Sequence, residues 1–128
     1  MNQQNPEPLT RTLTQAMIDA YARASGDFNP IHIDEAFART TPMGGTIAHG
    51  MLVLALISEV MTAGCGRSWL SGGKLDVRFR APARPGDTLT AQATRAPGGD
   101  RLRFNVVCVN QTGEVLIAGT AEMASEAG

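Results

Sequence analysis

Both histidines of the chain lie in its least regular stretch, between Gly26 and Gly50. His32 closes the string DFNPIH at residues 27–32, so a carboxyl group and an imidazole stand five positions apart. In a fully extended chain their Cα atoms would be about 16 Å apart, and their side chains would point to opposite faces. The two groups can therefore cooperate in proton transfer only if the backbone turns between them.

Asn29 and Pro30 provide such a turn. Proline fixes its own φ and keeps the preceding residue out of the helical region, and the Asn29 amide can fold back on the backbone. We expect Asp27 and His32 then to face one pocket, where a protonated carboxyl and a neutral imidazole take a proton from water and deliver one to carbon. Such general acid–base catalysis contributes about 10²- to 10⁴-fold in rate. The alternative is that Asp27 is only a turn or capping residue and His32 a hydrogen-bonded loop histidine.

His49 and Gly50 stand at the predicted start of an apolar helix. The first N–H groups of a helix are unpaired and carry the positive end of its dipole, and a glycine lets a substrate carbonyl approach closely. Gly50 N–H is therefore a candidate oxyanion donor, a group worth about 2.7 to 4 kcal/mol of transition-state stabilisation in other enzymes. The alternative is that Gly50 only permits close packing against a strand, while His49 caps the helix or packs.

Other side chains are weaker candidates. Ser58 can hydrogen-bond a group in the pocket or bond back to its own helix. Glu59 can act as a catalytic carboxylate or occupy an exposed helix position. No metal-ligand spacing, phosphate-binding loop or dinucleotide-binding glycine pattern is present, so we expect no metal site. Three arginines can contact the phosphates of a large substrate or line a solvated strand face: Arg78, Arg80 and Arg84.

Hydrophobic periodicity predicts the helices that must position these groups. Leu13, Thr14 and Ile18 occupy the N′, N-cap and N4 positions of a hydrophobic staple. The segment 48–63 is apolar on nearly every face, so we expect it to be buried all round. The two predicted helices cover residues 14–24 and 48–63, with at most a short helix over 34–40 between them.

Four later runs alternate between apolar and polar residues with the period of two that β-strands require. We expect an α+β fold in which an antiparallel sheet of four or five consecutive strands curls around the helix 48–63. A single small sheet covers such a helix incompletely and leaves open edges, so we also expect a homodimer. The four runs cover residues 75–81, 89–94, 102–108 and 115–123.

The composition fits one soluble domain with a small partner. The chain has 128 residues, and we expect a flexible tail over 1–8 and a single domain over 9–128. A net charge of −1 makes nucleic acid and anionic membranes poor partners. Cys65 and Cys108 form no paired motif, so we expect packing residues in a reducing cytoplasm. The N-terminus shows no signal-peptide pattern, and the longest apolar run, 51–57, is too short to span a bilayer.

Three separated segments resemble the MaoC-like dehydratases, in particular the (R)-specific enoyl-CoA hydratases of the hot-dog fold: YARASGDFNPIH at 21–32, IAHGM at 47–51 and RFRAPARPGDTL at 78–89. The resemblance extends from about residue 9 to residue 124. It implies reversible hydration of trans-2-enoyl thioesters of coenzyme A to (R)-3-hydroxyacyl thioesters. It also implies a homodimer with the acyl chain in a tunnel near the subunit interface. Coenzyme A is part of the substrate, so no further cofactor is expected.

The resemblance also implies roles for individual residues. Asp27 and His32 match the pair that binds and activates the catalytic water, and Gly50 matches the oxyanion glycine. Three residues match positions that support the site: Asn29 in the catalytic loop, His49 beside the glycine and Ser58 on the central helix.

Two other functions stay open at this point. A hot-dog protein can hydrolyse acyl-CoA thioesters with a carboxylate on the central helix, for which Glu59 is the candidate, although the intact acid–base motif argues against it. The chain can also be a non-catalytic acyl-thioester-binding subunit, yet such a subunit needs neither the Asp27–His32 pair nor Gly50. The acyl-chain length, the carrier and the division of roles between Asp27 and His32 stay open as well.

Overall fold

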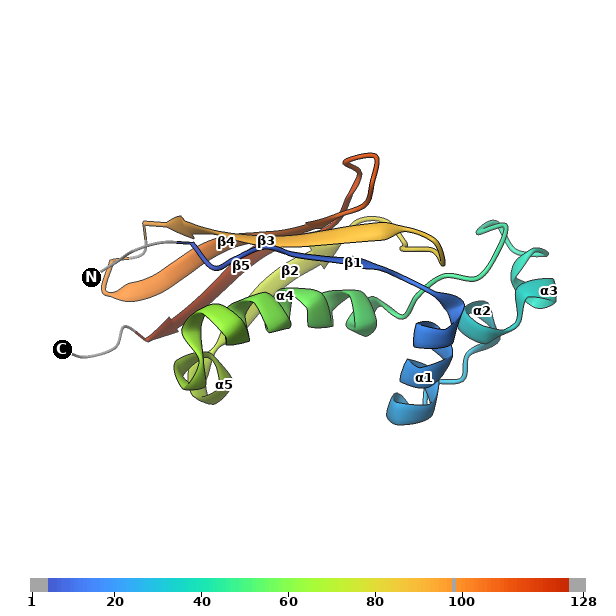
Figure 1. Cartoon of the computed structure of the whole chain (residues 1–128), viewed down its shortest axis with the longest axis horizontal. Helices are drawn as coiled ribbons and strands as arrows, with labels where there is room; N and C mark the ends of the chain where they lie inside the picture. The colour runs from blue at the N-terminus through green and yellow to red at the C-terminus, as the bar shows by residue number, and fades with distance from the viewer. Residues whose placement is uncertain (1–4, 98, 125–128) are drawn as a thin grey trace.

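A five-stranded antiparallel sheet with the order β1-β3-β4-β5-β2 forms the main layer of the protein (Figure 1). The computed structural model describes residues 5–97 and 99–124. The strands are β1 (Leu9–Thr12), β2 (Lys74–Phe79), β3 (Thr88–Ala96), β4 (Arg101–Val109) and β5 (Val115–Ala124). β3, β4 and β5 follow one another as antiparallel neighbours, as their alternating patterns predicted.

The expectation that β2 pairs with the strand after it was wrong. β2 lies at one edge of the sheet and pairs with β5. The chain stays beside β5 for two more residues, because Arg80 N and Ala81 N both donate to Leu116 O, at 2.8 and 3.4 Å. Because Pro82 and Pro85 lack N–H donors, the next residues cannot continue this ladder. The segment therefore crosses to the far side of the sheet, where β3 pairs with β1.

β1 forms the other edge of the sheet, and its four residues are too few to show a period in the sequence. The expected tail over 1–8 lies partly outside the described residues, which begin at Asn5. Asn5 Oδ1 accepts a hydrogen bond from Arg95 N at 2.8 Å. Pro6 lies against α4, since a Cβ atom added to Gly64 would come within 2.7 Å of Pro6 Cβ. These contacts tie residues 5 and 6 to the domain.

Five helices complete the described chain: α1 (Gln15–Ser25), α2 (Pro30–Ile33), α3 (Glu35–Ala38), α4 (Gly50–Cys65) and α5 (Arg67–Gly72). Thr14 is the N-cap of α1, and its hydroxyl accepts from Met17 N at 3.1 Å. Leu13 and Ile18 are 1% and 0% exposed, which confirms the predicted entry into this helix. The sequence pattern did not predict α2 and α5, because helices of four and six residues show no full period.

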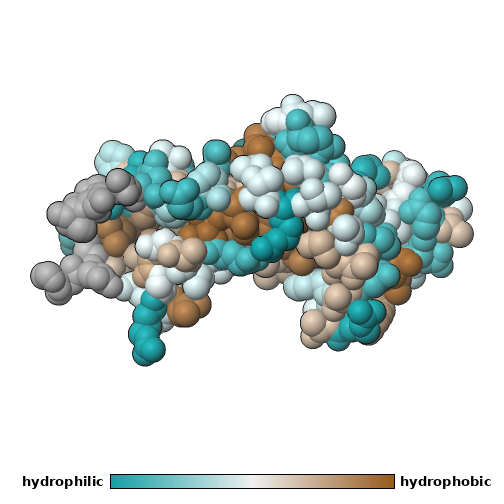
Figure 2. All heavy atoms as spheres, viewed as in Figure 1, coloured by the Kyte–Doolittle hydropathy of each residue, from teal (hydrophilic) through white to brown (hydrophobic). Residues whose placement is uncertain are grey.

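α4 lies along one face of the sheet, and α1, α2 and α3 gather beyond its N-terminal end (Figure 1). It begins at Gly50, two residues after the predicted start, because the His49 backbone is extended. Apolar atoms gather along the line where the strands meet α4 (Figure 2). The sheet-facing side of the helix is buried through Val53, Leu56, Ile57, Val60 and Met61.

The expected burial of this helix on all faces was wrong for a single chain. Met51, Glu59 and Ala63 are exposed on α4, because no second layer of the described chain covers them. A five-stranded antiparallel sheet packed on one long central helix is nevertheless the hot-dog fold, so the expected fold class is confirmed. None of the helices in the described ranges is long and apolar enough to cross a membrane.

Candidate active site

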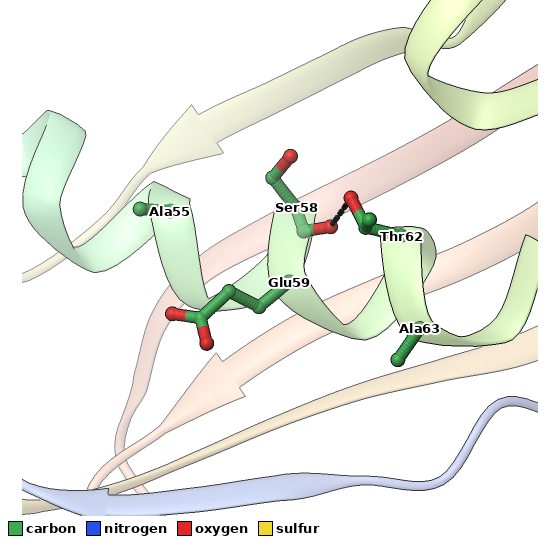
Figure 3. A pocket seen from close by; sticks show the side chains of 5 residues that line it. All are labelled: Ala55, Ser58, Glu59, Thr62 and Ala63. Atoms are coloured by element: carbon green, nitrogen blue, oxygen red, sulfur yellow. Dashed lines mark hydrogen bonds between the residues drawn. The ribbon is translucent and has the colours of Figure 1, made fainter. Parts of the chain in front are cut away.

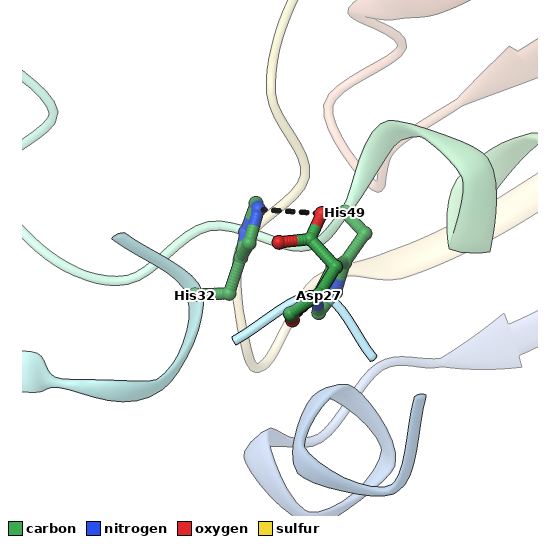
Figure 4. Close-up of side chains that lie close together, drawn as sticks. All are labelled: Asp27, His32 and His49. Atoms are coloured by element: carbon green, nitrogen blue, oxygen red, sulfur yellow. Dashed lines mark hydrogen bonds and ion pairs between the residues drawn. The ribbon is translucent and has the colours of Figure 1, made fainter. Parts of the chain in front are cut away.

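The loop between α1 and α2 turns so that Asp27 faces His32. Asn29 is the N-cap of α2, and its Oδ1 accepts from Ile31 N at 3.1 Å, while Pro30 takes the first helical position. Asp27 Oδ1 accepts from Asn29 N at 3.2 Å, so Asp27 is a turn residue as well as a site candidate. The other carboxylate oxygen, Oδ2, lies 4.0 Å from His32 Nε2 (Figure 4).

The hydrogen bonds of His32 determine its tautomer. Nδ1 lies 2.8 Å from the carbonyl oxygen of Ile47, and a carbonyl only accepts, so Nδ1 carries the proton. In the neutral ring the Nε2 lone pair then faces Asp27. The 4.0 Å between Nε2 and Asp27 Oδ2 is too long for a direct hydrogen bond. A water molecule about 2.8 Å from both atoms would bridge them at an angle of about 90°.

His49 holds Asp27 and His32 in place through one hydrogen bond and a ring contact. Its Nε2 donates to the backbone carbonyl of Asp27 at 2.9 Å, which holds the turn against the start of α4. Its ring stacks on His32 with centroids 3.8 Å apart and planes inclined by 24°, and Tyr21 packs edge-on against it at 4.8 Å. His49 is 3% exposed. It therefore both packs and positions Asp27, and it does not cap α4 with its side chain.

The possible metal ligands of Asp27, His32 and His49 lie within 4.8 Å of one another. Imidazole lone pairs lie in the plane of the ring, and a zinc ion binds about 2.0 to 2.1 Å from each nitrogen. The two histidine rings are stacked, so their lone pairs run side by side and do not converge on one point. His32 Nδ1 is also used by Ile47 O. The arrangement does not fit a shared cation.

Gly50 opens α4 next to this cluster, directly after His49. Its N–H finds no backbone acceptor in the described part of the chain, as expected for the first residue of a helix. The 16 residues of α4 place the positive end of the helix dipole there. The ring of Phe79 covers Gly50 Cα, since an added Cβ would lie 2.9 Å from Phe79 Cε2. The N–H of Gly50 is thus available to an oxyanion, and its Cα leaves little room.

Replacing Gly50 with alanine is expected to reduce hydration at least about tenfold, because the methyl group intrudes where a thioester carbonyl must approach the N–H. The helix itself tolerates alanine, so the melting temperature should not fall. The Phe79 ring is 54% exposed and can move aside. The double variant Gly50→Ala/Phe79→Ala separates the two effects: recovery of wild-type activity would show that Gly50 serves only to accommodate Phe79.

Ser58 stands apart from the Asp27–His32 pair. It lies eight residues after Gly50, about 12 Å farther along the helix. With Ala55, Glu59, Thr62 and Ala63 it lines an open groove of about 490 Å³ on the uncovered side of α4 (Figure 3). Ser58 Oγ lies 3.3 Å from Trp69 Nε1, whose N–H donates to it from α5. Within one chain, the structure does not bring Ser58 to the acid–base pair.

Glu59 is committed to an ion pair with Arg11. The guanidinium donates from Nη1 to Oε2 at 2.7 Å and from Nη2 to Oε1 at 3.1 Å, so both carboxylate oxygens are engaged. The hydrogen bonds from Arg11 hold the pKa of Glu59 below its ordinary value, although partial burial opposes this effect. A carboxylate held in this way is a poor general base, so the geometry does not favour the thioesterase alternative.

Replacing Glu59 with glutamine should lower the free energy of unfolding at pH 7 by less than about 1 kcal/mol, because half-exposed pairs are weak. The lowered pKa of Glu59 means that its stabilisation is present above the ordinary value of 4.5 and is lost as the pH falls through the folded-state value. Urea titrations should therefore show the two proteins converging in acid. A difference that persists at about pH 2 would contradict the Arg11–Glu59 origin of the effect.

The remaining candidates are not part of the cluster. Arg78, Arg80 and Arg84 are exposed on β2 and in the connection after it. Cys108 is a packing residue, and burial raises the pKa of its thiol to about 11. Cys65 is half-buried at the end of α4 and packs against the core.

Several groups that hold the site carried no usable sequence signal. The carbonyl of Ile47 fixes the His32 tautomer, but a backbone acceptor is common to all residue types. Gln15 bonds to the His32 carbonyl and to the Thr46 hydroxyl from distant positions. Tyr21 lies within the family-like string at 21–32, but nothing in that string indicates that its ring packs edge-on against His49.

The chain is similar to known proteins in both sequence and fold. The "MaoC like domain" family model matches residues 1–119. The chain is 35% identical over 119 residues to an "(R)-specific enoyl-CoA hydratase" of Rhodospirillum rubrum, covering 88% of this chain and 80% of that protein. It is 35% identical over 120 residues to a "3-hydroxybutyryl-CoA dehydratase" of Methylorubrum extorquens, covering 90% and 74%.

A solved structure is also similar, that of an R-hydratase from Pseudomonas aeruginosa in the unliganded form. It superposes with a TM-score of 0.82 at 33% identity, covering 97% of this chain and 81% of that one. The family model, the relatives and the fold agree, and the chain belongs to the MaoC-like domain family.

Proposed function

We propose that the protein is an (R)-specific enoyl-CoA hydratase that adds water reversibly to trans-2-enoyl thioesters. The observation that carries this proposal is the 4.0 Å separation of Asp27 Oδ2 and His32 Nε2, which one water molecule can bridge, close in the chain to the first N–H of α4. The relatives named as enoyl-CoA hydratase and 3-hydroxybutyryl-CoA dehydratase support the same chemistry.

In the hydration direction His32 acts first. Its Nε2 lone pair takes a proton from the bridging water, and the oxygen of that water forms a bond to Cβ of the enoyl thioester. The electron pair of the Cα–Cβ double bond moves toward the thioester carbonyl, which gains enolate character. Protonated Asp27 then delivers its proton to Cα. A second water molecule that takes the bridging position relays the proton from His32 back to Asp27, which restores the starting state.

Gly50 stabilises the negative charge that develops on the thioester oxygen. Its N–H lies at the positive end of α4, and the enolate-like state carries more charge on oxygen than the substrate does. The donor therefore lowers the barrier more than it tightens substrate binding.

A homodimer is part of the proposal. The uncovered side of α4 and the unpaired edge of β2 are apolar or hydrogen-bonding surfaces that a second copy would cover. Covering α4 would also enclose the groove lined by Ser58, where the acyl chain can extend. Light scattering coupled to size exclusion should give the mass of two chains.

The decisive experiment follows the loss of enoyl-thioester absorbance with crotonyl-CoA and with enoyl-CoAs up to C12, with chiral analysis of the product. The proposal expects turnover and an (R)-3-hydroxyacyl product. Release of free thiol without hydration would support a thioesterase instead. Binding without turnover, together with stable association with a different chain, would support a non-catalytic subunit.

A further inference from the structure

The side-chain amide of Gln15 connects α1 to the segment that carries His32. Gln15 is the first residue of α1. Its Nε2 donates to the His32 carbonyl at 2.8 Å and to Asp19 Oδ1 at 2.9 Å, and its Oε1 accepts from Thr46 Oγ1 at 2.7 Å. A carbonyl and a carboxylate only accept hydrogen bonds, so these partners determine which way the amide points. Both N–H groups and the oxygen of the amide are in use.

These bonds act on the His32 imidazole through two chain segments, the one that carries His32 and the one that carries Thr46 and Ile47. The His32 carbonyl lies near the C-terminal end of α2, where helical carbonyls lack partners within the helix. Thr46 is 3% exposed and precedes Ile47, whose carbonyl accepts from His32 Nδ1. Gln15 therefore joins the backbone that carries the imidazole to the Thr46 side chain, next to the carbonyl that holds Nδ1. The hydrogen bond from Ile47 N to Ile31 O at 3.1 Å pairs the same two segments directly.

We propose that Gln15 is a positioning residue that sets the tautomer and the direction of His32. By keeping the His32 and Ile47 segments in register, it keeps the proton on Nδ1 and the Nε2 lone pair toward Asp27. Gln15 acts through His32 rather than on the substrate. The kinetic part of this inference rests on the proposed hydratase function, whereas the structural part does not.

Two substitutions test the amide. Gln15→Met keeps the length of the side chain and removes all three hydrogen bonds. Gln15→Glu keeps the shape but turns an oxygen toward His32 O and Asp19 Oδ1, which repel it. Small displacements of a catalytic group strongly reduce the rate of the chemical step. We therefore expect kcat to fall about ten- to hundredfold in Gln15→Met, with KM changed less than about threefold. In Gln15→Glu we expect kcat to fall further. If Gln15→Glu does not fold, Gln15→Met carries the test.

Gln111 offers a matched control. Its Oε1 accepts from Thr88 N at 2.9 Å and its Nε2 donates to Asp87 Oδ1 at 3.0 Å, so it joins its own turn to the distant segment 87–88. Its hydrogen-bond partners are not those of the His32 segment. Gln111→Met should change the melting temperature but leave kcat at the wild-type value. Equal losses of kcat in Gln15→Met and Gln111→Met would overturn the proposal.

A spectroscopic readout keeps the test independent of activity. The chain has two histidines, so ¹⁵N-histidine labelling gives two ring systems. The structure assigns opposite tautomers to them when both rings are neutral, with the proton on Nδ1 in His32 and on Nε2 in His49. Gln15→Met should convert the His32 signals to a mixture of tautomers, whereas Gln111→Met should not. An unchanged Nδ1–H tautomer in Gln15→Met overturns the proposal, even if the wild-type protein hydrates no enoyl-CoA.

Discussion

Replacing Asp27 with asparagine is expected to lower kcat for enoyl-CoA hydration at least about a hundredfold, because the amide cannot deliver a proton to Cα. The substitution preserves the shape of the side chain and an oxygen that accepts from Asn29 N, so the turn before α2 should persist. The rate is measured by the loss of crotonyl-CoA absorbance, and the fold by circular dichroism and the melting temperature.

Asp34 provides the control for this substitution. Its Oδ1 accepts from Phe37 N at 3.0 Å at the start of α3, which is a local capping role similar to that of Asp27. Asp34→Asn should keep wild-type kcat with a comparable small change in stability. Full activity in Asp27→Asn would reduce Asp27 to a turn residue and remove it from the mechanism.

Replacing His32 removes the base and is expected to cost at least about a hundredfold in kcat. Both His32→Ala and His32→Asn remove the ring that stacks on His49, but His32→Ala also removes the hydrogen bond to Ile47 O, so a loss of activity there has two explanations. His32→Asn resolves them, because the asparagine amide can still donate to Ile47 O in place of Nδ1 but has no group at the position of Nε2. Both variants should be inactive.

Stability separates the two histidine variants. His32→Asn should retain more of the wild-type melting temperature than His32→Ala, because the loop keeps its bond to Ile47 O. Activity near the wild-type value in His32→Asn would show that Nε2 takes no proton. The double variant with Asp27→Asn should lose little beyond the single variants, since the two groups act on one water.

Local rules of the chain predicted the turn at the site and much of the fold. Thr14 before an apolar period predicted the start of α1, and the alternation of β3, β4 and β5 predicted their pairing. Asn29 and Pro30 predicted the turn that brings Asp27 and His32 to one side. These features follow from residue types and their local spacing, so the sequence pattern predicts them.

Contacts between distant segments were not predictable in the same way. The edge position of β2 follows from its pairing with β5 across the whole domain, not from its own pattern. The ion pair that occupies Glu59 joins residues 48 positions apart. The uncovered side of α4 arises because one sheet covers one face of a helix, although the helix is apolar nearly all round.

The sequence by itself determined which groups can carry the chemistry, because residue type and a proline turn are local properties of residues 27–32 and of Gly50. Only the tertiary structure decided how those groups are held. The His32 tautomer depends on the Ile47 carbonyl, 15 positions away, and on the Gln15 amide, 17 positions away. Hydrogen bonds of this kind have no period and no fixed spacing, so they become visible only when the packed chain brings their partners together.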